Sequence, residues 1–218
     1  MHFIRNVFGK AGLVILKNIM NREETLTLKA IVLYILKNSK SRASHTVYYI
    51  LKTAFAAQQK HLAKYLSPLF NDEIIALQFG PVPSALYDAL KIARGDAKTM
   101  YLHRNDELHL VYDAISFCDE TFTAKENPDM NYLSKSAIEC INEALEVVSA
   151  MSFEDIVNAP HGVEWNRAYN NPESKNMSYL AIAREGGADE SSISYLKENL
   201  ELDCLLINDR GTEPPSGT

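Results

Sequence analysis

The hydrophobic residues of most of this chain recur every three or four positions, which is the period of an amphipathic α-helix. The first such segment covers residues 23–37, with acidic residues at its start and apolar positions at Leu28, Ile31, Val32, Ile35 and Leu36. The same spacing predicts further helices over residues 44–66, 83–94, 131–150, 152–159 and 160–170, and on both sides of Gly186 and Gly187. Ser44 and Ser152 stand where helix N-caps are expected.

Other segments have the short apolar runs or the alternation that favours strands. Residues 73–79 predict one short buried strand, and residues 99–112 predict two strands around a turn at Asn105 and Asp106. The polar residues 119–131 are expected to form a loop. The whole pattern predicts a mainly α fold, a compact helical domain with a small β-hairpin or short sheet.

The segment FGPVP, residues 79–83, lies where the strand period changes to a helical period. Pro81 and Pro83 fix their own φ angles and push Gly80 and Val82 towards extended conformations, so the junction is stiff. With one glycine, and with prolines where N–H donors would be needed, it does not match a phosphate-binding loop. We therefore interpret it as a scaffold junction, at which Gly80 permits a close backbone approach.

The ends of the chain differ from its middle. We expect an N-terminal extension over residues 1–22, the helical domain over 23–203, and a flexible, Pro- and Gly-rich tail over 204–218. The six uncharged residues from Ala11 to Leu16 are too few for a signal peptide, and no stretch approaches the ~20 apolar residues of a membrane span. The extension is interpreted as an extra amphipathic helix. Alternatively, the start codon was assigned too early and translation begins at Met20.

Composition places the chain among ordinary globular proteins, with 46% apolar and 23% charged residues. Three cysteines, at positions 118, 140 and 204, are too few and too scattered for a disulfide framework, so a cytoplasmic location is expected. The net charge of −6 is unevenly distributed. Residues 1–64 contain eleven Lys and Arg against two acidic residues, whereas residues 111–218 contain seven against twenty. The basic third either contacts an acidic protein or nucleic acid, or faces the acidic half of its own chain.

Candidate chemical groups are scattered through the sequence. His103 and His109 flank the predicted turn but point to opposite sheet faces unless a one-residue bulge intervenes, so no metal site is expected there. His61 and His161 are interpreted as structural histidines, and Cys140 as a buried, unreactive thiol. The eleven tyrosines suit partly buried positions and protein interfaces.

Two stretches resemble a known family. In KHLAKYLSPLFNDEIIALQFGPVPSALYDAL, residues 60–90, the order of residue types resembles the signature of the Panacea, or SocA-like, domain, and NAPHGVEWNRAY, residues 158–169, resembles its second motif. The matching positions, to which the resemblance assigns a scaffold role, are His61, Pro68, Phe70, Gly80, Pro81, Val82, Tyr87, His161 and Trp165. The resemblance spans about residues 25–200. The sequence departs from the pattern at Gly162–Glu164, where relatives often have a proline before the tryptophan, and at Gln78 and Phe79.

This resemblance implies a helical bacterial or prophage protein that acts as the antitoxin of a toxin–antitoxin pair. Such antitoxins bind a toxin encoded by a neighbouring gene, and one branch delivers the toxin to a protease as a proteolytic adaptor. No catalytic residue, metal or cofactor is implied, so an enzyme is not expected. Two alternatives stay open: a metal-dependent or histidine-based hydrolase using His61, His161 or the hairpin histidines, and a nucleic-acid-associated regulator suggested only by the basic first third.

The site at which a toxin binds is predicted from charge. The polar faces of the first two helices carry a basic cluster beside tyrosines, and such a cluster accelerates association with an acidic protein. The predicted partner-binding residues are Lys37, Lys40, Arg42, Tyr48, Tyr49 and Lys52. Contacts with membranes or nucleic acid are not expected.

Overall fold

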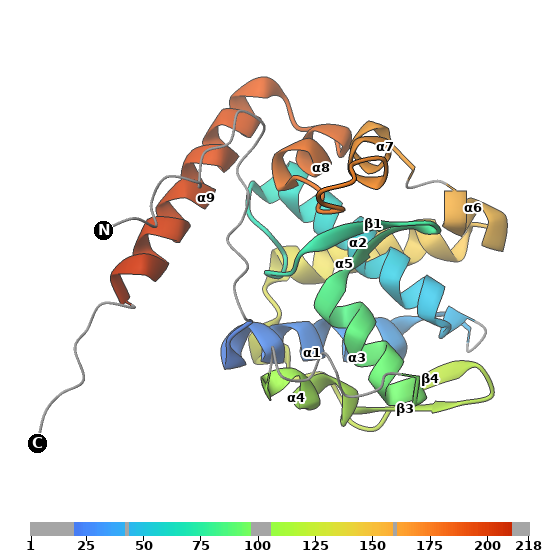
Figure 1. Ribbon diagram of the computed structural model, residues 1–218. Helices are drawn as coiled ribbons and strands as arrows, with labels where there is room; N and C mark the ends of the chain where they lie inside the picture. The colour runs from blue at the N-terminus through green and yellow to red at the C-terminus, as the bar shows by residue number, and fades with distance from the viewer. Residues whose placement is uncertain (1–19, 42–43, 97–105, 159–160, 211–218) are drawn as a thin grey trace, which may run out of the picture.

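The computed structural model describes residues 20–41, 44–96, 106–158 and 161–210. Within these residues the chain forms nine α-helices and two separate antiparallel sheets of two strands each (Figure 1). The prediction of a mainly helical domain with a small β element is confirmed.

Helices α1 (Arg22–Asn38), α2 (Val47–Tyr65) and α5 (Lys135–Ser149) form the centre of the core. Each begins at a side chain that accepts a hydrogen bond from a free backbone N–H group: Asn21 for α1, Thr46 for α2 and Ser134 for α5. The cap of α2, Thr46, therefore lies two residues after the predicted cap, Ser44. The apolar stripes pack as predicted, and each fully buried Leu or Ile stabilises the fold by about 1.5–3 kcal/mol.

Strands β1 (Ile74–Leu77) and β2 (Gly80–Pro83) form a tight hairpin with Ile74 opposite Pro83 and Leu77 opposite Gly80. The stiff junction of the sequence is thus a strand in its own right. The other edge of β1 is bonded by residues 175–177, where the Ala76 N–H donates to the Lys175 carbonyl at 2.9 Å and the Met177 N–H donates to the Ile74 carbonyl at 2.8 Å. The hairpin therefore joins the middle of the chain to its C-terminal third.

Helix α3 (Ser84–Arg94) follows directly from β2, with Pro83 at the cap position and Gly95 in the left-handed conformation at its end. Proline has no capping side chain, and Asp72 supplies the cap from the loop before β1. Both carboxylate oxygens of Asp72 accept from the Ala85 N–H at 3.0 Å, and one also accepts from the Leu86 N–H at 3.3 Å. A residue outside the helix thus fixes its start.

The predicted strand after Asn105 is wrong. Residues 106–112 form a 3₁₀ turn, η3 (Asp106–Leu108), and the short helix α4 (His109–Tyr112). Leu108 and Val111 are buried at a spacing of three, which a helix accommodates and a strand does not. The other predicted strand, residues 99–104 with His103, lies outside the described residues.

The prediction of a loop over residues 119–131 is wrong in part. Strands β3 (Ile115–Cys118) and β4 (Thr121–Ala124) form a second hairpin whose two-residue turn, Asp119 and Glu120, has positive φ at both positions, and the 3₁₀ turn η4 (Met130–Tyr132) follows it. Asp-Glu lacks the glycine that usually marks such a turn. Phe122 on β4 is completely buried, and its N–H donates to the His45 carbonyl at 2.9 Å.

Four helices complete the fold: α6 (Phe153–Asn158), α7 (Val163–Tyr169), α8 (Tyr179–Glu185) and α9 (Glu190–Arg210). The predicted capping box of α6 is present, since Ser152 Oγ accepts from the Asp155 N–H and Asp155 accepts from the Ser152 N–H. Gly186 and Gly187 separate α8 from α9 as predicted.

Helix α9 extends along one side of the molecule to Arg210, so residues 204–210 of the expected tail are helical (Figure 1). None of the described helices is long and apolar enough to span a membrane.

Replacement of the Asp72 cap should weaken the start of α3. Asp72→Ala leaves the Ala85 and Leu86 N–H groups without their acceptor and should lower the free energy of unfolding by about 1–2 kcal/mol. Asp72→Asn keeps one acceptor oxygen and should lose less. Urea unfolding of the two variants measures the difference. Equal losses for Ala and Asn would show that the backbone contacts of Asp72 do not stabilise the helix.

Candidate functional site

A buried lysine lies beside three of the family-motif residues, Gly80, Pro81 and His161. Lys52 projects from α2 towards β2 with only 3% of its surface exposed, and its amine donates to the Pro81 carbonyl at 3.0 Å. Burial lowers the pKa of Lys52 to about 7, because the charged form loses its hydration. Tyr49 is also buried, with 4% exposed. Two of the six residues predicted to face a partner therefore lie in the interior.

Gly80 allows the hairpin to approach this lysine. Its φ of 93° lies in the left-handed region that side chains rarely adopt. A Cβ atom there would lie 2.5 Å from Lys52 Nζ and 3.3 Å from His161 Nε2. A side chain at this position would therefore strain the backbone and displace the Lys52 amine.

Helix α7 and His161, two residues before it, contribute a column of stacked rings beside this site. The rings of His161 and Trp165 stack with centroids 3.8 Å apart, and those of Trp165 and Tyr169 with centroids 4.7 Å apart. The Trp165 indole N–H donates to the Leu77 carbonyl at 3.0 Å, which fastens the column to β1. Burial, and then the neighbouring Lys52, lower the pKa of His161. The structure thus brings together four of the motif residues, Gly80, Pro81, His161 and Trp165.

Two residues outside the motif, Gln58 and Tyr179, hold the loop before β1, in which the motif residues Pro68 and Phe70 lie. Gln58 on α2 accepts from the Leu69 N–H at 2.7 Å and donates to the Phe70 carbonyl at 3.1 Å. Tyr179 on α8 donates to the Asp72 carbonyl at 2.6 Å. Phe70 and Val82 are buried, whereas Pro68 and Tyr87 are partly exposed. These contacts position the loop that carries the Asp72 cap.

A buried acid fixes α7 to the chain that follows it. Glu164 has 5% of its surface exposed, accepts two 2.7 Å hydrogen bonds from the Arg167 guanidinium, and accepts a third from the Ser178 N–H at 2.5 Å. The sequence analysis assigned no role to Glu164 or to the interior position of Lys52. A signal was present for Lys52, which lies one turn after Tyr48 and directly after Leu51 on the apolar stripe of α2.

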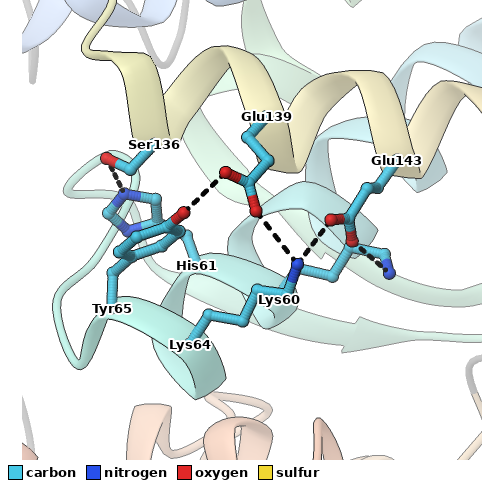
Figure 2. A network of polar contacts seen from close by, with 7 residues as sticks. All are labelled: Lys60, His61, Lys64, Tyr65, Ser136, Glu139 and Glu143. Carbon is cyan, nitrogen blue, oxygen red and sulfur yellow. Dashed lines mark hydrogen bonds and ion pairs between the residues drawn. The ribbon is translucent and has the colours of Figure 1, made fainter.

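His61 connects the end of α2 to the start of α5 (Figure 2). Its Nδ1 lies 2.8 Å from the Ser67 carbonyl and its Nε2 lies 3.1 Å from Ser136 Oγ. Since a carbonyl only accepts, Nδ1 carries the proton. Burial lowers the pKa of His61, and in the neutral ring Nε2 accepts from the Ser136 hydroxyl. This chain of contacts orients two helix ends, and it also places a hydroxyl against a potential general base.

An ion-pair network crosses the same two helices (Figure 2). Lys60 pairs with Glu143 at 3.0 Å, Lys64 pairs with both Glu139 and Glu143, and the Tyr65 hydroxyl donates to Glu139 at 2.8 Å. The lysine ion pairs lower the pKa of Glu143, and hydrogen bonds from Tyr65 and then Lys64 lower that of Glu139. Lys29 likewise pairs with Glu126 at 2.6 Å. These basic residues face the acidic half of their own chain, one of the two alternatives left open by the charge pattern.

The other predicted partner-binding residues have different positions. Lys37 and Lys40 are exposed at and after the end of α1, and Arg42 lies outside the described residues. Tyr48 is half-buried. Its ring makes edge contacts with Phe79 at the tip of the β1–β2 hairpin, at 5.9 Å between centroids, and with Phe153 on α6, at 5.5 Å. Phe79 and Phe153 are 47% and 64% exposed, so the three rings form an exposed aromatic surface.

A depression of about 400 Å³ adjoins this surface, and we call it the aromatic groove. Its lining residues come from the start of α2, the end of α3, the β3–β4 hairpin, α6 and the end of α5. Its lining residues are Ser44, Thr46, Val47, Tyr48, Tyr49, Arg94, Phe117, Glu120, Val148, Ser149, Met151, Phe153 and Ile156. Apolar and aromatic side chains therefore predominate, as in many binding pockets.

The described residues contain no group of three or more metal-ligating side chains close enough to hold an ion. Cys140 is buried, and burial raises the pKa of its thiol to about 11, so the thiolate is disfavoured. Cys118 is exposed on β3, and His109 is exposed on α4.

Comparison with known proteins identifies the family. A family model described as antitoxin SocA-like, Panacea domain, matches residues 50–166, more than half of the chain. The chain belongs to this family. The matched residues run from α2 to α7 and contain Lys52, the β1–β2 hairpin and Trp165, whereas α1, α8 and α9 lie outside them. Searches of curated proteins and of solved structures returned no match. Membership of the Panacea family suggests a non-enzymatic role and a protein partner.

Replacement of Lys52 should change how stability depends on pH. The pKa of the folded state, about 7, lies below the ordinary value of 10.5, so the unfolded chain binds the proton more tightly between these pH values. Stability of the wild type should therefore rise with pH from about 7 to 10.5, and Lys52→Met should remove that part of the rise. Urea unfolding across this range measures it. Parallel pH profiles for the two proteins would contradict a neutral, buried amine.

Two glycines allow backbone strain to be separated from crowding. Gly80 and Gly95 both have positive φ, but no atom of the described residues lies within 4 Å of a Cβ added at Gly95. Gly95→Ala should therefore cost only backbone strain, about 1 kcal/mol, whereas Gly80→Ala should cost about 1–2 kcal/mol more because it displaces Lys52 from Pro81. Thermal or urea unfolding of both variants tests this. Equal losses would mean that Lys52 moves aside without loss of stability.

Proposed function

We propose that the protein is the antitoxin of a bacterial or prophage toxin–antitoxin pair, and that it neutralises its toxin by direct binding in the cytoplasm. The family match over residues 50–166 is the observation that carries this proposal. The exposed aromatic surface of Tyr48, Phe79 and Phe153 supports it, since exposed aromatic side chains are enriched where proteins bind each other. The toxin would be encoded by an adjacent gene, and a protease that receives the bound toxin would be a second partner.

Co-expression tests the proposal. The neighbouring open reading frame, expressed alone, should stop growth, and co-expression of this protein should restore it through a complex that co-purifies. Neutralisation by sequestration leaves the toxin intact, whereas delivery to a protease shortens the lifetime of the toxin in cells. Growth arrest that this protein does not relieve, for either adjacent gene, would contradict the proposed function.

Charge at the end of α1 should affect association with the toxin. Lys37→Glu, Lys40→Glu and Arg42→Glu together should slow association and reduce rescue of growth, because a basic cluster attracts an acidic partner over long distances. The matched control reverses three other exposed charges, Lys125, Lys135 and Lys197. Deletion of residues 211–218, beyond α9, should change neither the association rate nor the rescue of growth. Association rates from surface plasmon resonance at two salt concentrations measure the effect, and equal rates for the triple reversal and its control would place the site elsewhere.

A second candidate function is hydrolysis at Ser136. One contact favours it: the Ser136 hydroxyl donates to Nε2 of a neutral His61, and the Nδ1–H of that ring donates to the Ser67 carbonyl. This pair resembles the nucleophile and the base of a hydrolase. However, His61 is only 6% exposed, and neither residue lines the aromatic groove. A fluorophosphonate probe distinguishes the functions: we expect no labelling, whereas stoichiometric labelling lost in Ser136→Ala would favour a hydrolase.

A further inference from the structure

Helix α9 has apolar side chains on two faces, and the described residues cover only one of them. Ile193, Leu196 and Leu200 are buried, and among the described elements α8 is the one that packs extensively against α9. Tyr195 and Leu202 lie seven residues apart, which is two helical turns, so they share a different face. They are 55% and 56% exposed. A helix that is apolar on more than one side is normally covered on each of those sides.

Helix α8 is too short to cover the whole of α9. The two helices have 7 and 21 residues, so α9 is longer by about 20 Å at a rise of 1.5 Å per residue. Figure 1 shows α9 extending along one side of the molecule. Residues 204–207 in its second half are four consecutive apolar residues in the sequence. Another segment is therefore needed beside this half of α9.

Charge restricts which segment can lie there. Residues 190–210 contain five acidic and two basic residues, so a second copy of α9 would bring the same negative charge and be repelled. Residues 1–19 contain three basic residues, Arg5, Lys10 and Lys17, and no acidic residue. Their apolar residues also recur at helical spacing, at Ile4, Phe8, Ala11, Ile15 and Ile19. The N-terminal segment of the same chain is therefore complementary to α9 in charge and in apolar pattern.

The start of α1 lies at the same end of the molecule as the start of α8. Glu24, in the first turn of α1, accepts from the Asn71 side chain at 2.8 Å. Tyr179, the first residue of α8, donates to the Asp72 carbonyl at 2.6 Å. Residues 1–19 precede this point directly. As a helix, residues 4–19 would be about 24 Å long, which is enough to follow the second half of α9.

We propose that residues 4–19 pack as an amphipathic helix against the face of α9 that contains Tyr195 and Leu202. The apolar residues of the segment cover these two side chains, and its basic residues lie near the acidic residues of α9. Gly9 and Gly12 each disfavour a helix by about 1 kcal/mol, so the segment depends on α9 for its helical structure. This contact does not rest on the proposed antitoxin function, and both of its elements lie outside the residues that the family model matches.

Hydrogen–deuterium exchange of the full chain tests the contact. Amides of residues 4–19 should exchange at least about tenfold more slowly than those of a free peptide of the same sequence. Leu202→Asp should remove this protection, and Ile15→Asp should speed exchange in residues 195–210, because each change places a charge in the apolar contact. Exchange in α8 should stay unchanged, since the side chain of Leu202 is exposed and does not pack on that helix.

The matched control is Met130→Asp on η4, another apolar side chain, 47% exposed, which should alter exchange in neither segment. Exchange of residues 4–19 at the rate of the free peptide would overturn the proposal. So would variants whose effects are confined to the segment that is mutated. Sedimentation of the wild type gives a further decisive result: a dimer that Leu202→Asp dissociates would show that a second copy covers α9 instead.

Discussion

The contact between Lys52 and the Pro81 carbonyl is the constraint on which the arrangement of the domain depends. A buried amine needs an acceptor, and the one it has is the backbone of β2. Because the Lys52 amine reaches that carbonyl, β2 packs against α2, and a side chain at residue 80 would crowd the amine. Trp165 then attaches α7 to the strand paired with β2, and residues 175–177 extend its outer edge. The C-terminal third is therefore positioned by the hairpin.

One turn of α2 separates the interior of this site from its exterior. Lys52 points inward to the hairpin, whereas Tyr48, four residues earlier, contacts Phe79 at the hairpin tip and Phe153 on α6. The exposed rings of Tyr48 and Phe79 therefore belong to the same two elements, α2 and the β1–β2 hairpin, that the Lys52–Pro81 contact joins. A surface supported in this way is pre-organised, so a partner that binds it meets side chains whose conformational entropy is already reduced.

The helices could be predicted because their apolar period is long and their caps are local in sequence. Leu28, Ile31 and Ile35 identify α1 without reference to any other segment. Where the determining contact comes from a distant segment, the sequence was insufficient. Residues 106–112 alternate well enough for a strand, but Leu108 and Val111 are buried together in a helical turn. The turn of the β3–β4 hairpin is formed by Asp119 and Glu120. Both have positive φ angles, which the sequence does not indicate because neither residue is a glycine.

The site shows the same limit. The motif residues Gly80, Pro81, His161 and Trp165 were identified by their resemblance to a family. The position of Lys52 on the apolar stripe of α2 was a weak signal that the charge-based prediction did not use. The burial of Lys52 depends on β2, which begins 28 residues later in the chain. Likewise, the lack of a hydrogen-bond partner for the buried Tyr49 hydroxyl among the described residues can be recognised only from the three-dimensional structure. The charge pattern predicted a basic partner-binding surface on the first two helices. The packing of the core places two of its predicted members, Tyr49 and Lys52, in the interior.

The ring column on α7 gives the protein an intrinsic optical reporter. Trp165 is its only tryptophan, is 9% exposed, and stacks on an imidazole that lies beside Lys52. Indole fluorescence therefore arises from a single position, and that position is the contact between α7 and the β1–β2 hairpin. Separation of these two elements would expose the indole and shift its emission to longer wavelength. Emission spectra thus follow the docking of one helix, while the far-ultraviolet circular dichroism of the same sample follows the whole helical fold.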